Sequence, residues 1–406
     1  MTDYDIIIIG AGMVGASLAC ALRGQAFRIG LIEAVPFSND AQPSYDARTT
    51  ALSYGTKRIF DGMGLWEQLN GKVTPIKKIH VSDQGHCGFT RLDAAEQGCE
   101  AYGYVVENYS LGKVFADNIN TLPNVELLCP ARVEDVTIDA ESARVTVQLG
   151  EAERCTYTTR LVVLADGRKS PVRERLGIQA SHWSYGQSAV IANISAARAH
   201  GNVAYERFTR QGPLALLPMS DNRCAVVWTL RDDNLDSVMG LGDSGFLHAL
   251  QTQFGWRLGK LLQVGKRYSY PLALMRSHEL VRPRLALIGS AAHTLHPVAG
   301  QGFNLGLRDV AVFAQVLVSA GQEGLEPGHI AVLERYAQWR QRDHQHVTTF
   351  TDALVHVFSN DVAPLVAARN IGLALADILP LFKDALVRQG MGLAGRQPRL
   401  ARGLPL

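Results

Sequence analysis

Apolar residues at the start of the chain follow the pattern of a buried strand and a helix. In "YDIIIIG" four consecutive isoleucines lead into Gly10, and such a β-branched run is typical of a parallel strand buried on both faces. Helical spacing follows from Met13 to Arg23, and "FRIGLIE" predicts a second strand. We predict a βαβ unit rather than a signal peptide or a membrane span. The uncharged run from Ile6 to Leu22 is short, follows acidic residues and is interrupted by glycines.

The pattern of apolar residues changes in the middle of the chain. Between 187 and 271 the apolar segments are short, rich in β-branched and aromatic residues, and separated by turn residues. This pattern predicts a mostly antiparallel sheet that forms a second domain. The segments "RLVVLADG" and "RLALIGS" are similar to the opening strand, so we expect them to return to the first sheet. The nucleotide-binding domain is then discontinuous, with the β-rich domain inserted in it.

Beyond residue 303 the periodicity becomes helical. Apolar and aromatic residues recur every three or four positions from Val332 to Leu354, as on one face of a helix. A further helical stretch is expected after Pro364. We predict a nucleotide-binding domain from 1–72, 99–180 and 275–340, a substrate domain from 73–98 and 181–274, and a C-terminal helical region over 341–406.

Composition narrows the class of protein. The chain has 406 residues, of which 47% are apolar and 19% charged, with a formal net charge of +2. It can therefore bury a large core, and nothing in its charge indicates a nucleic-acid partner. Six cysteines show neither C-x-x-C nor metal-ligand spacing. We expect reduced thiols in a reducing cytoplasm and no metal site.

The first motif with chemical meaning is "GAGMVG", with Gly10, Gly12 and Gly15. It follows a predicted strand and begins a predicted helix, and Glu33 ends the next strand. Glycines let a backbone approach a pyrophosphate, the helix N-terminus offers free N–H groups, and the carboxylate binds ribose hydroxyls. A dinucleotide is therefore expected, and the motif alone does not separate FAD from NAD.

Two later strand ends carry further motifs. Asp166 and the following glycine lie directly after an apolar strand, where the side chain can cap a helix or bind a ligand. A second strand ends at Gly289 and Ser290. It leads into a loop with little side-chain cover and then an apolar helix, with these notable residues: Pro297, Gly300, Gln301, Gly302 and Asn304. Such a helix N-terminus suits a flat group that gains negative charge, such as a reduced flavin ring.

Together these motifs resemble the para-hydroxybenzoate hydroxylase family of FAD monooxygenases. Within it, five segments are similar to the ubiquinone-biosynthesis aromatic hydroxylases: "DARTTAL", "GYVVEN", "ADGRKSPVR", "TLHPVAGQGFNLGLRD" and "YAQWRQRD". The Leu-His pair before Pro297 and the Phe of "GQGFN" resemble the 2-octaprenyl-6-methoxyphenol hydroxylases most. The resemblance extends over nearly the whole chain. It implies an α/β fold with a Rossmann-like FAD-binding domain of the GR2 type, an inserted mostly antiparallel substrate domain and C-terminal helices.

The resemblance also implies roles for residues. Three glycines hold the FAD pyrophosphate, Glu33 binds the adenosine ribose, and Arg48 and Asp166 lie near the cofactor. The loop around Gly289 and the segment from Pro297 to Asn304 surround the flavin. One departure concerns Ser290, because the family usually has Asp or Asn there to contact the ribityl chain. A serine hydroxyl is shorter and neutral, which weakens the expected contact with FAD.

The implied activity is hydroxylation of a polyprenylated phenol in ubiquinone biosynthesis, with 2-polyprenyl-6-methoxyphenol at C1 as the first candidate. NAD(P)H would reduce FAD, O₂ would form a flavin C4a-hydroperoxide, and its electrophilic oxygen would pass to the ring. A hydroxylase of small soluble phenols and a non-catalytic flavoprotein scaffold of a quinone-biosynthesis complex remain as alternatives. A flavin halogenase is not supported, because this sequence has no W-x-W-x-I segment. A cytoplasmic enzyme is expected, in peripheral contact with the inner membrane or with a biosynthetic complex.

Several other residues have an ordinary explanation beside a functional one. His293 and His296 are candidate catalytic groups, although packing of their loop is the favoured interpretation. Aromatic residues such as Trp183, Tyr185 and Trp228 could line a substrate pocket but fit a core better. Three charged residues of the late helix are expected on a solvated face or in an intrachain pair: Arg340, Arg342 and Asp343. The stretch 365–386 could touch a membrane, but packing against the nucleotide-binding domain is favoured.

Overall fold

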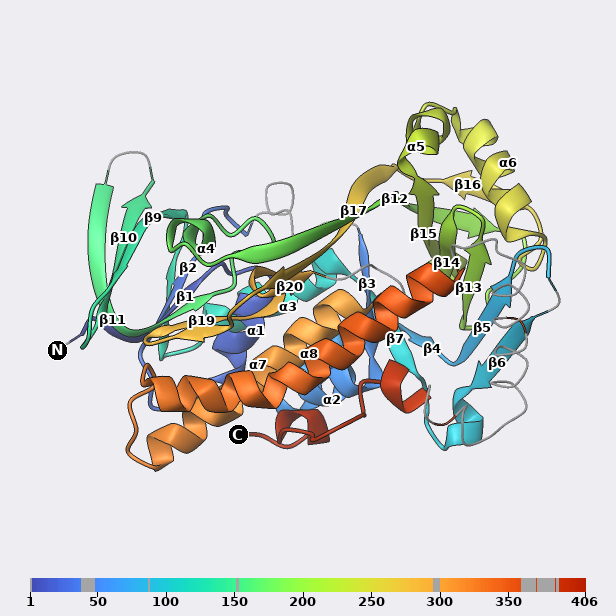
Figure 1. Cartoon of the computed structure of the whole chain (residues 1–406). Coiled ribbons are helices and arrows are strands. Elements are labelled where there is room, and N and C mark those ends of the chain that lie inside the picture. The colour runs from blue at the N-terminus through green and yellow to red at the C-terminus, as the bar shows by residue number, and fades with distance from the viewer. Residues whose placement is uncertain are drawn as a thin grey trace.

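The chain folds into two neighbouring parts, each built on a large sheet. The computed structural model describes residues 2–37, 48–86, 88–150, 153–294, 300–358, 370, 384 and 387–406, without the side chains of 350–358. Figure 1 shows the first part at the left and the second at the right, with helix α8 (Ile330–Phe358) running from one to the other.

The first part contains an eight-stranded sheet with a parallel centre. Its order is β18-β19-β11-β1-β2-β8, and β9 and β10 extend β11 as an antiparallel pair. The opening isoleucines form β1 (Tyr4–Ile9), which pairs in parallel with β11 and β2, as the sequence predicts. The other strands are β2 (Ile29–Ile32), β8 (Val125–Leu128), β9 (Ala131–Ile138), β10 (Ala143–Leu149), β11 (Glu153–Leu164), β18 (Val281–Arg282) and β19 (Leu285–Leu287).

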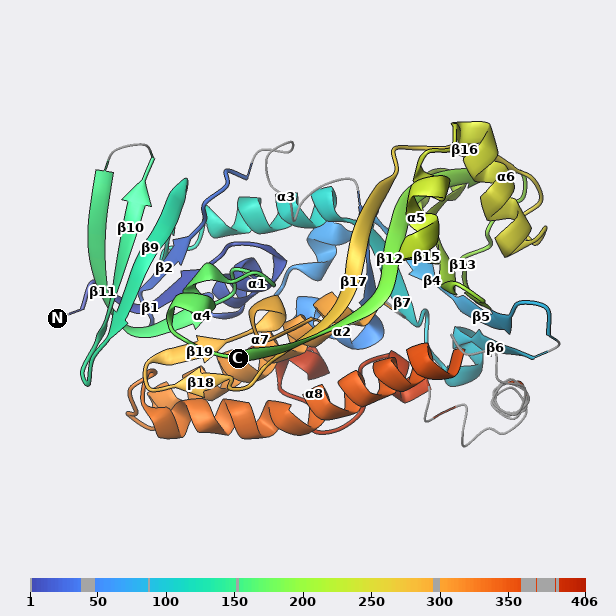
Figure 2. The ribbon, with the colours of Figure 1, turned by 45° about the horizontal axis from the view of Figure 1, so that its top comes forward.

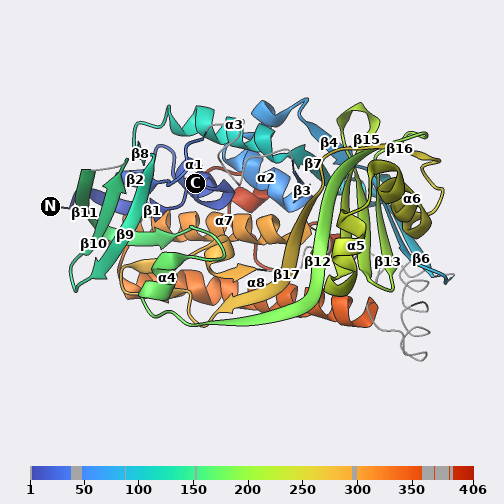
Figure 3. The ribbon, with the colours of Figure 1, turned by 90° about the horizontal axis from the view of Figure 1, so that it is seen from above.

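Helices cover this sheet and bury the main core. They are α1 (Met13–Ala21), α3 (Asn108–Ile119) and α7 (Gln301–Gln322), and the short helix α4 (Pro171–Arg175) follows β11. Side chains of β1, α1 and α7 share one hydrophobic cluster. Figure 3 shows α7 and α8 side by side beneath the sheet region. By length and composition, α7 is the one described helix apolar enough to cross a membrane, and 83% of its most apolar window is buried, as in a core helix.

The second part is a nine-stranded, mostly antiparallel sheet in which β5 and β13 alone pair in parallel. Its strands are β5 (Lys78–Asp83), β6 (Phe89–Asp93), β12 (Ala180–Ala196), β13 (Val203–Thr209), β14 (Gly212–Pro218), β15 (Arg223–Arg231), β16 (Leu261–Val264), β17 (Tyr268–Ser277) and β20 (His293–Thr294). The two long strands β12 and β17 reach back towards the first part (Figure 2).

Two helices in this part were not expected from the sequence. They are α5 (Asp232–Met239) and α6 (Asp243–Phe254), which cover one face of the nine-stranded sheet. No residue of α5 is buried, and three aspartates stand among its eight residues. Its apolar residues Leu235, Val238 and Met239 pack against the core of the sheet, but eight residues give too short a pattern to predict a helix from the sequence.

A three-stranded sheet lies between the two larger ones. It comprises β3 (Thr49–Ser53), β7 (Gly103–Glu107) and β4 (Val73–Ile76), followed after β3 by α2 (Tyr54–Gly62). Thus the predicted substrate-domain segment 73–98 contributes β4 to this sheet and β5 and β6 to the nine-stranded one. Helix α8 also continues through residue 341, where the C-terminal region was expected to begin. The domain limits remain a prediction, as does the helix at 365–386, which falls almost entirely outside the described residues.

Candidate cofactor and active site

Three strand ends from distant parts of the sequence meet at one edge of the first sheet. In register, Ile9 of β1 pairs with Leu164 of β11, and Leu164 pairs with Leu287 of β19. The carboxyl ends of parallel strands share an edge, and ligands of open α/β sheets bind there. The segments that follow carry Gly10, Asp166 and Gly289 respectively.

Close backbone approach explains two of the glycines. A Cβ atom on Gly10 would lie 2.7 Å from the carbonyl oxygen of Ala165, and φ at Gly10 is +98°. A Cβ atom on Gly15 would lie only 1.9 Å from the carbonyl oxygen of Gly10. The turn between β1 and α1 can therefore keep this compact form only with glycine at both positions.

Two helices present their N-termini near these strand ends without a side-chain cap. Gly12 is the N-cap of α1 and Gly300, at φ +60°, is the N-cap of α7, and neither makes a side-chain capping bond. Neither helix has an acidic residue in its first turn. The N–H groups and positive dipole ends of both helices thus suit an anionic ligand.

The two predicted carboxylates differ in how they are bound. Glu33 accepts hydrogen bonds from the backbone N–H groups of Ala11, at 2.8 Å, and Val35, at 2.9 Å, which fix it beside the glycine turn. By contrast, both carboxylate oxygens of Asp166 are buried with no hydrogen-bond donor among the described residues. Burial is the largest cause that raises the pKa of Asp166 to about 6.

A buried arginine links the second and third strand ends. Arg173 Nη1 donates to the carbonyl oxygen of Ala291 at 2.9 Å, and Nη2 donates to that of Arg168 at 3.3 Å. The side chain is 2% exposed. It therefore fixes the turn that holds Gly289 and the exposed Ser290 against the segment that holds Asp166.

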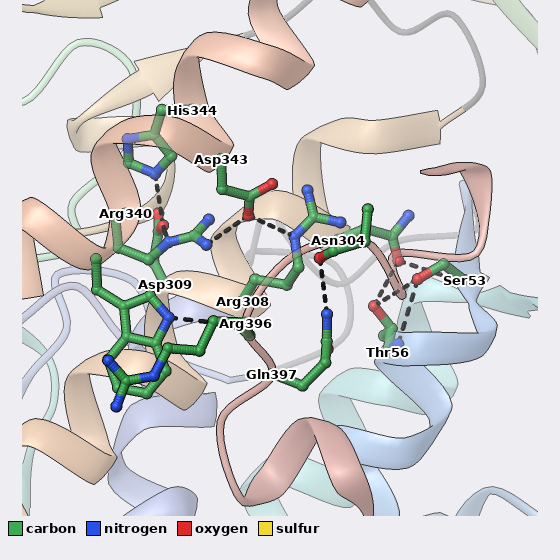
Figure 4. A network of polar contacts seen from close by, with 12 residues as sticks. Ser53, Thr56, Asn304, Arg308, Asp309, Arg340, Asp343, His344, Arg396 and Gln397 are labelled. Atoms are coloured by element: carbon green, nitrogen blue, oxygen red, sulfur yellow. Dashed lines mark hydrogen bonds and ion pairs between the residues drawn. The ribbon is translucent and has the colours of Figure 1, made fainter. Parts of the chain in front are cut away.

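The third strand end is also held by a buried carboxylate on α7. Asp309 is fully buried, and its Oδ2 accepts from Gly289 N at 3.1 Å and from His293 Nε2 at 2.8 Å. Its Oδ1 accepts from Arg340 Nε and His344 Nε2, both at 2.7 Å. Figure 4 shows the α7–α8 part of this network, in which Asp343 joins Arg340 to Arg308. Arg340 is thus paired as expected, but buried rather than on a solvated face.

In this network Asp309 and Arg340 form an ion pair, and His344 is neutral. Burial alone would raise the pKa of Asp309, but His344, Arg340 and His293 hold it well below its usual range. Burial lowers the pKa of His344 to about 4. Although Asp309 and the two histidines are close enough to suit a metal, their facing atoms are already engaged with one another and with Arg340. The cluster therefore positions the Gly289 turn.

Asn304 serves as a second tie at the start of α7. Its Oδ1 accepts from Ser53 N at 2.8 Å and from Thr56 Oγ1 at 2.7 Å (Figure 4). Its Nδ2 donates to the carbonyl oxygens of Ala51 and Gly300. The side chain is thus directed at protein groups and holds the loop before α7 against β3 and α2. The predicted contact between Asn304 and a flavin remains a prediction.

The remaining predicted residues fall in several places. Arg48 immediately precedes β3, and its guanidinium stacks over the ring of Tyr270 at 5.0 Å. Gln301 is buried, whereas a Cβ on Gly302 would meet only open space. Pro297 and His296 lie outside the described residues. His293 is buried against Asp309, which fits the packing interpretation.

Of the aromatic residues considered for a pocket, Trp228 is core. It is 3% exposed and packs on Phe246 at a ring distance of 5.7 Å. Trp183 is 51% exposed. The cysteines that the structure describes are all free thiols: Cys20, Cys99, Cys129, Cys155 and Cys224.

A comparison with protein families decides what this edge of the sheet binds. The model of the FAD binding domain family matches residues 3–351. The chain belongs to the FAD binding domain family. FAD is therefore its cofactor. The glycine turn, the uncapped helix ends and the unpartnered Asp166 carboxylate fit such a ligand, which supplies negative phosphates and hydroxyl donors.

Known members of this family are similar over the full length. The chain is 40% identical to the ubiquinone hydroxylase UbiL of Rhodospirillum rubrum, over 99% of this chain and 93% of that protein. It is 31% identical to 3-demethoxyubiquinol 3-hydroxylase of Escherichia coli, over 96% and 98% respectively. The p-nitrophenol 4-monooxygenase PnpA of Pseudomonas putida has the same fold, with a TM-score of 0.81 at 20% identity, over 97% of this chain and 98% of that one.

These findings confirm the α/β fold with its FAD domain and inserted sheet, and they place the chain among FAD-dependent aromatic monooxygenases that use NAD(P)H as reductant. The sequence did not reveal Asp309 and His344 as parts of the site. One signal was available, because Arg308 and Asp309 are the only charged residues in the 22 residues of α7. An isolated charge in an apolar helix needs a buried partner.

Proposed function

We propose that this protein hydroxylates the ring of a polyprenylated phenol in ubiquinone biosynthesis, with 2-polyprenyl-6-methoxyphenol at C1 as the first candidate. The observation that supports the pathway is the 40% identity to a ubiquinone hydroxylase over nearly the full length of both chains. The choice of the C1 position rests only on the residues before Pro297 and in "GQGFN", so the ring position remains the part most in need of a test.

The chain's own residues supply binding and positioning in this function. Bound FAD supplies the oxygen-transfer chemistry. The glycine turn at Gly10–Gly15 would hold the pyrophosphate of FAD and Glu33 its adenosine ribose, and the N-terminus of α7 would face the flavin ring. The ties made by Asp309 and Asn304 keep the strand end and the helix start fixed, because their donors and acceptors are buried and paired.

The decisive experiment is mass spectrometry of the quinone precursors in a strain that lacks this protein. We expect a polyprenylated phenol missing one hydroxyl to accumulate, and the mass and fragments of that compound identify the ring position. Complementation with the wild-type gene should remove it. Normal quinone content in the deletion strain, without a redundant hydroxylase, would contradict the proposal.

Two alternatives are separated by assays on the purified holoenzyme. A scaffold protein would show no substrate-stimulated NAD(P)H oxidation and no incorporation of oxygen from ¹⁸O₂. A hydroxylase of small phenols would turn over an unprenylated ring as fast as a prenylated one. We expect kcat/KM to rise with the length of the prenyl chain, because burial of apolar surface increases with each added unit.

We further propose that the enzyme docks on the bilayer that holds such a substrate. The supporting surface is the edge formed by residues 256–266, where Trp256 is 68% and Leu262 50% exposed. No acidic residue occurs between Asp243 and Glu279, and the exposed cations at this edge are Arg257, Lys260 and Lys266. Exposed aromatic and aliphatic residues among cations fit an anionic lipid surface. The expected cytoplasmic location at the inner membrane belongs to this proposal.

A further inference from the structure

Glu206 stands on β13 with apolar neighbours on both sides. In the register of the nine-stranded sheet it pairs with Ala215 of β14 and Val81 of β5. The row continues through Val227 and Ile191 to β17. Residues directly opposite one another in a sheet share a face, so Glu206 is the one charged member of a row that is apolar except for Thr90 of β6.

This face of the sheet looks towards the cofactor-binding part. Ile191 pairs with Tyr268, and Tyr270, two residues on, lies on the same face beneath the guanidinium of Arg48. Ala204, two residues before Glu206, packs with Ile76 and Val105 of the three-stranded sheet. The adjacent Tyr205 points the other way, onto Phe254 of α6 at 5.4 Å.

The carboxyl group has no internal partner to explain it. Among the residues that the structure describes, none forms a hydrogen bond or an ion pair with Glu206. Burial is the sole cause that raises its pKa, to about 7. By accessible surface Glu206 is only partly buried, and its apolar surroundings disfavour the ionised carboxylate. Such an environment is typical of a group kept for a ligand or for a reaction.

We propose that this apolar face binds the substrate ring and that Glu206 receives the proton of its phenolic hydroxyl. This inference rests on the proposed function, in that the ring must carry a hydroxyl. In the step, the phenolic O–H bond breaks, a carboxyl O–H bond forms on Glu206, and the electron pair stays on the phenolic oxygen. The phenolate raises electron density on the ring carbons that accept electrophilic oxygen. Glu206 returns the proton when the product leaves.

The test compares Glu206→Gln with wild type in the FAD-loaded enzyme. We expect kcat for hydroxylated product to fall about 100-fold, as on loss of a general base, with a change in KM below about 10-fold. Wild-type kcat should rise with pH through one ionisation near 7. The variant should lack that ionisation and recover activity as pH approaches the phenol's own pKa of about 10. Tyr205→Phe, on the same strand but facing α6, is the matched control and should keep wild-type kinetics.

The outcomes separate this inference from the proposed function. If wild type hydroxylates the prenylated phenol and Glu206→Gln keeps the same kcat and pH profile, the role of Glu206 is excluded alone. If wild type converts no prenylated phenol, the proposed function fails. Binding of simple phenol, followed by the flavin absorbance between pH 5 and 9, then decides the role of Glu206. A pH dependence that the Gln variant loses supports it, and identical curves overturn it. Should Glu206→Gln lose FAD or fold poorly, Glu206→Ala takes its place.

Discussion

Single residues in this protein carry more of the site's chemistry than their sequence context indicates. Asp166 is a good example, since an Asp-Gly pair after a strand is ordinarily a turn. In the fold its two carboxylate oxygens are buried and lack donors among the residues that the structure describes. Buried acceptors are nearly always satisfied. We propose that hydroxyl groups of FAD are the donors that this position lacks.

Asp166→Asn should weaken FAD binding by about 10-fold or more, because a hydrogen bond to a charged acceptor contributes about 1.5–3 kcal/mol. The pKa of Asp166 is raised to about 6, and hydroxyl donors favour its ionised form. Wild-type affinity should therefore increase as pH rises from 5 to 7, and the Asn variant should lack this increase. Quenching of flavin fluorescence in titrations at several pH values measures both. Asp117→Asn, on the exposed surface of α3, is the control, and equal pH dependence in wild type and Asp166→Asn would rule the role out.

The turn between β1 and α1 depends on the absence of a Cβ atom at Gly15. Gly15→Ala places a methyl group 1.9 Å from the carbonyl oxygen of Gly10, so the turn must open. We expect colourless apoprotein, measured as the ratio of absorbance at 450 nm to that at 280 nm. Gly242→Ala is the matched control, since a Cβ there meets nothing within 4 Å. Stoichiometric FAD in Gly15→Ala would be inconsistent with this description of the turn.

Helices α7 and α8 are joined by a buried ion-pair network whose stability depends on pH. His344 is neutral in the native state because burial lowers its pKa to about 4, whereas an unfolded histidine titrates near 6.5. The unfolded state therefore binds the additional proton between these values, and the free energy of unfolding must fall as pH drops from 6.5 towards 4.

His344→Gln should flatten this acid-induced loss, because Gln keeps a donor near Asp309 but does not titrate. Urea unfolding at pH 7, 6 and 5 gives the comparison. At pH 7 the variant should be less stable by about 1 kcal/mol from imperfect geometry. His346→Gln, two residues further along α8 and exposed, is the control. A parallel decline in wild type and His344→Gln would refute the assignment to His344.

The sequence was most informative where a signal is local. The β-branched run before Gly10, the spacing to Glu33 and the glycine loop before α7 each lie within a few dozen residues, so they predicted the cofactor site and its strands. Asp309 could not be assigned in this way, because its partners Arg340 and His344 are on another helix. The alternation in "YERFT" was equally uninformative, since Glu206 and Arg207 put a charge on each face of β13.

At the scale of the molecule, two sheets face each other across a smaller third one, and the substrate must reach that space from a membrane if the proposed function holds. The distal edge at 256–266 lies on the second part, away from the cofactor-binding strand ends (Figure 1). Docking through this edge would orient the inserted sheet towards the bilayer, with the FAD domain away from it.

Co-sedimentation with vesicles tests this docking. The wild-type holoenzyme should bind phosphatidylglycerol vesicles more strongly than phosphatidylcholine vesicles and should dissociate as salt is raised. Replacing Trp256 and Leu262 together by Ser should reduce binding at least several-fold. Trp183→Ser removes another exposed tryptophan elsewhere and should bind as wild type does. Unchanged sedimentation of the double variant would exclude this edge, and no binding to either vesicle, even with partner proteins added, would exclude docking.

The order of strands in the first sheet has a consequence for biogenesis. Its central strand β1 is synthesised first, whereas β19, which pairs with β11, follows only after residue 284, together with the Gly289 turn and α7. During translation the FAD site of the early βαβ unit therefore stays incomplete until the Gly289 turn and α7 have been synthesised. Flavin incorporation should occur late, when roughly three-quarters of the polypeptide has emerged, and a nascent chain stalled before α7 should remain colourless.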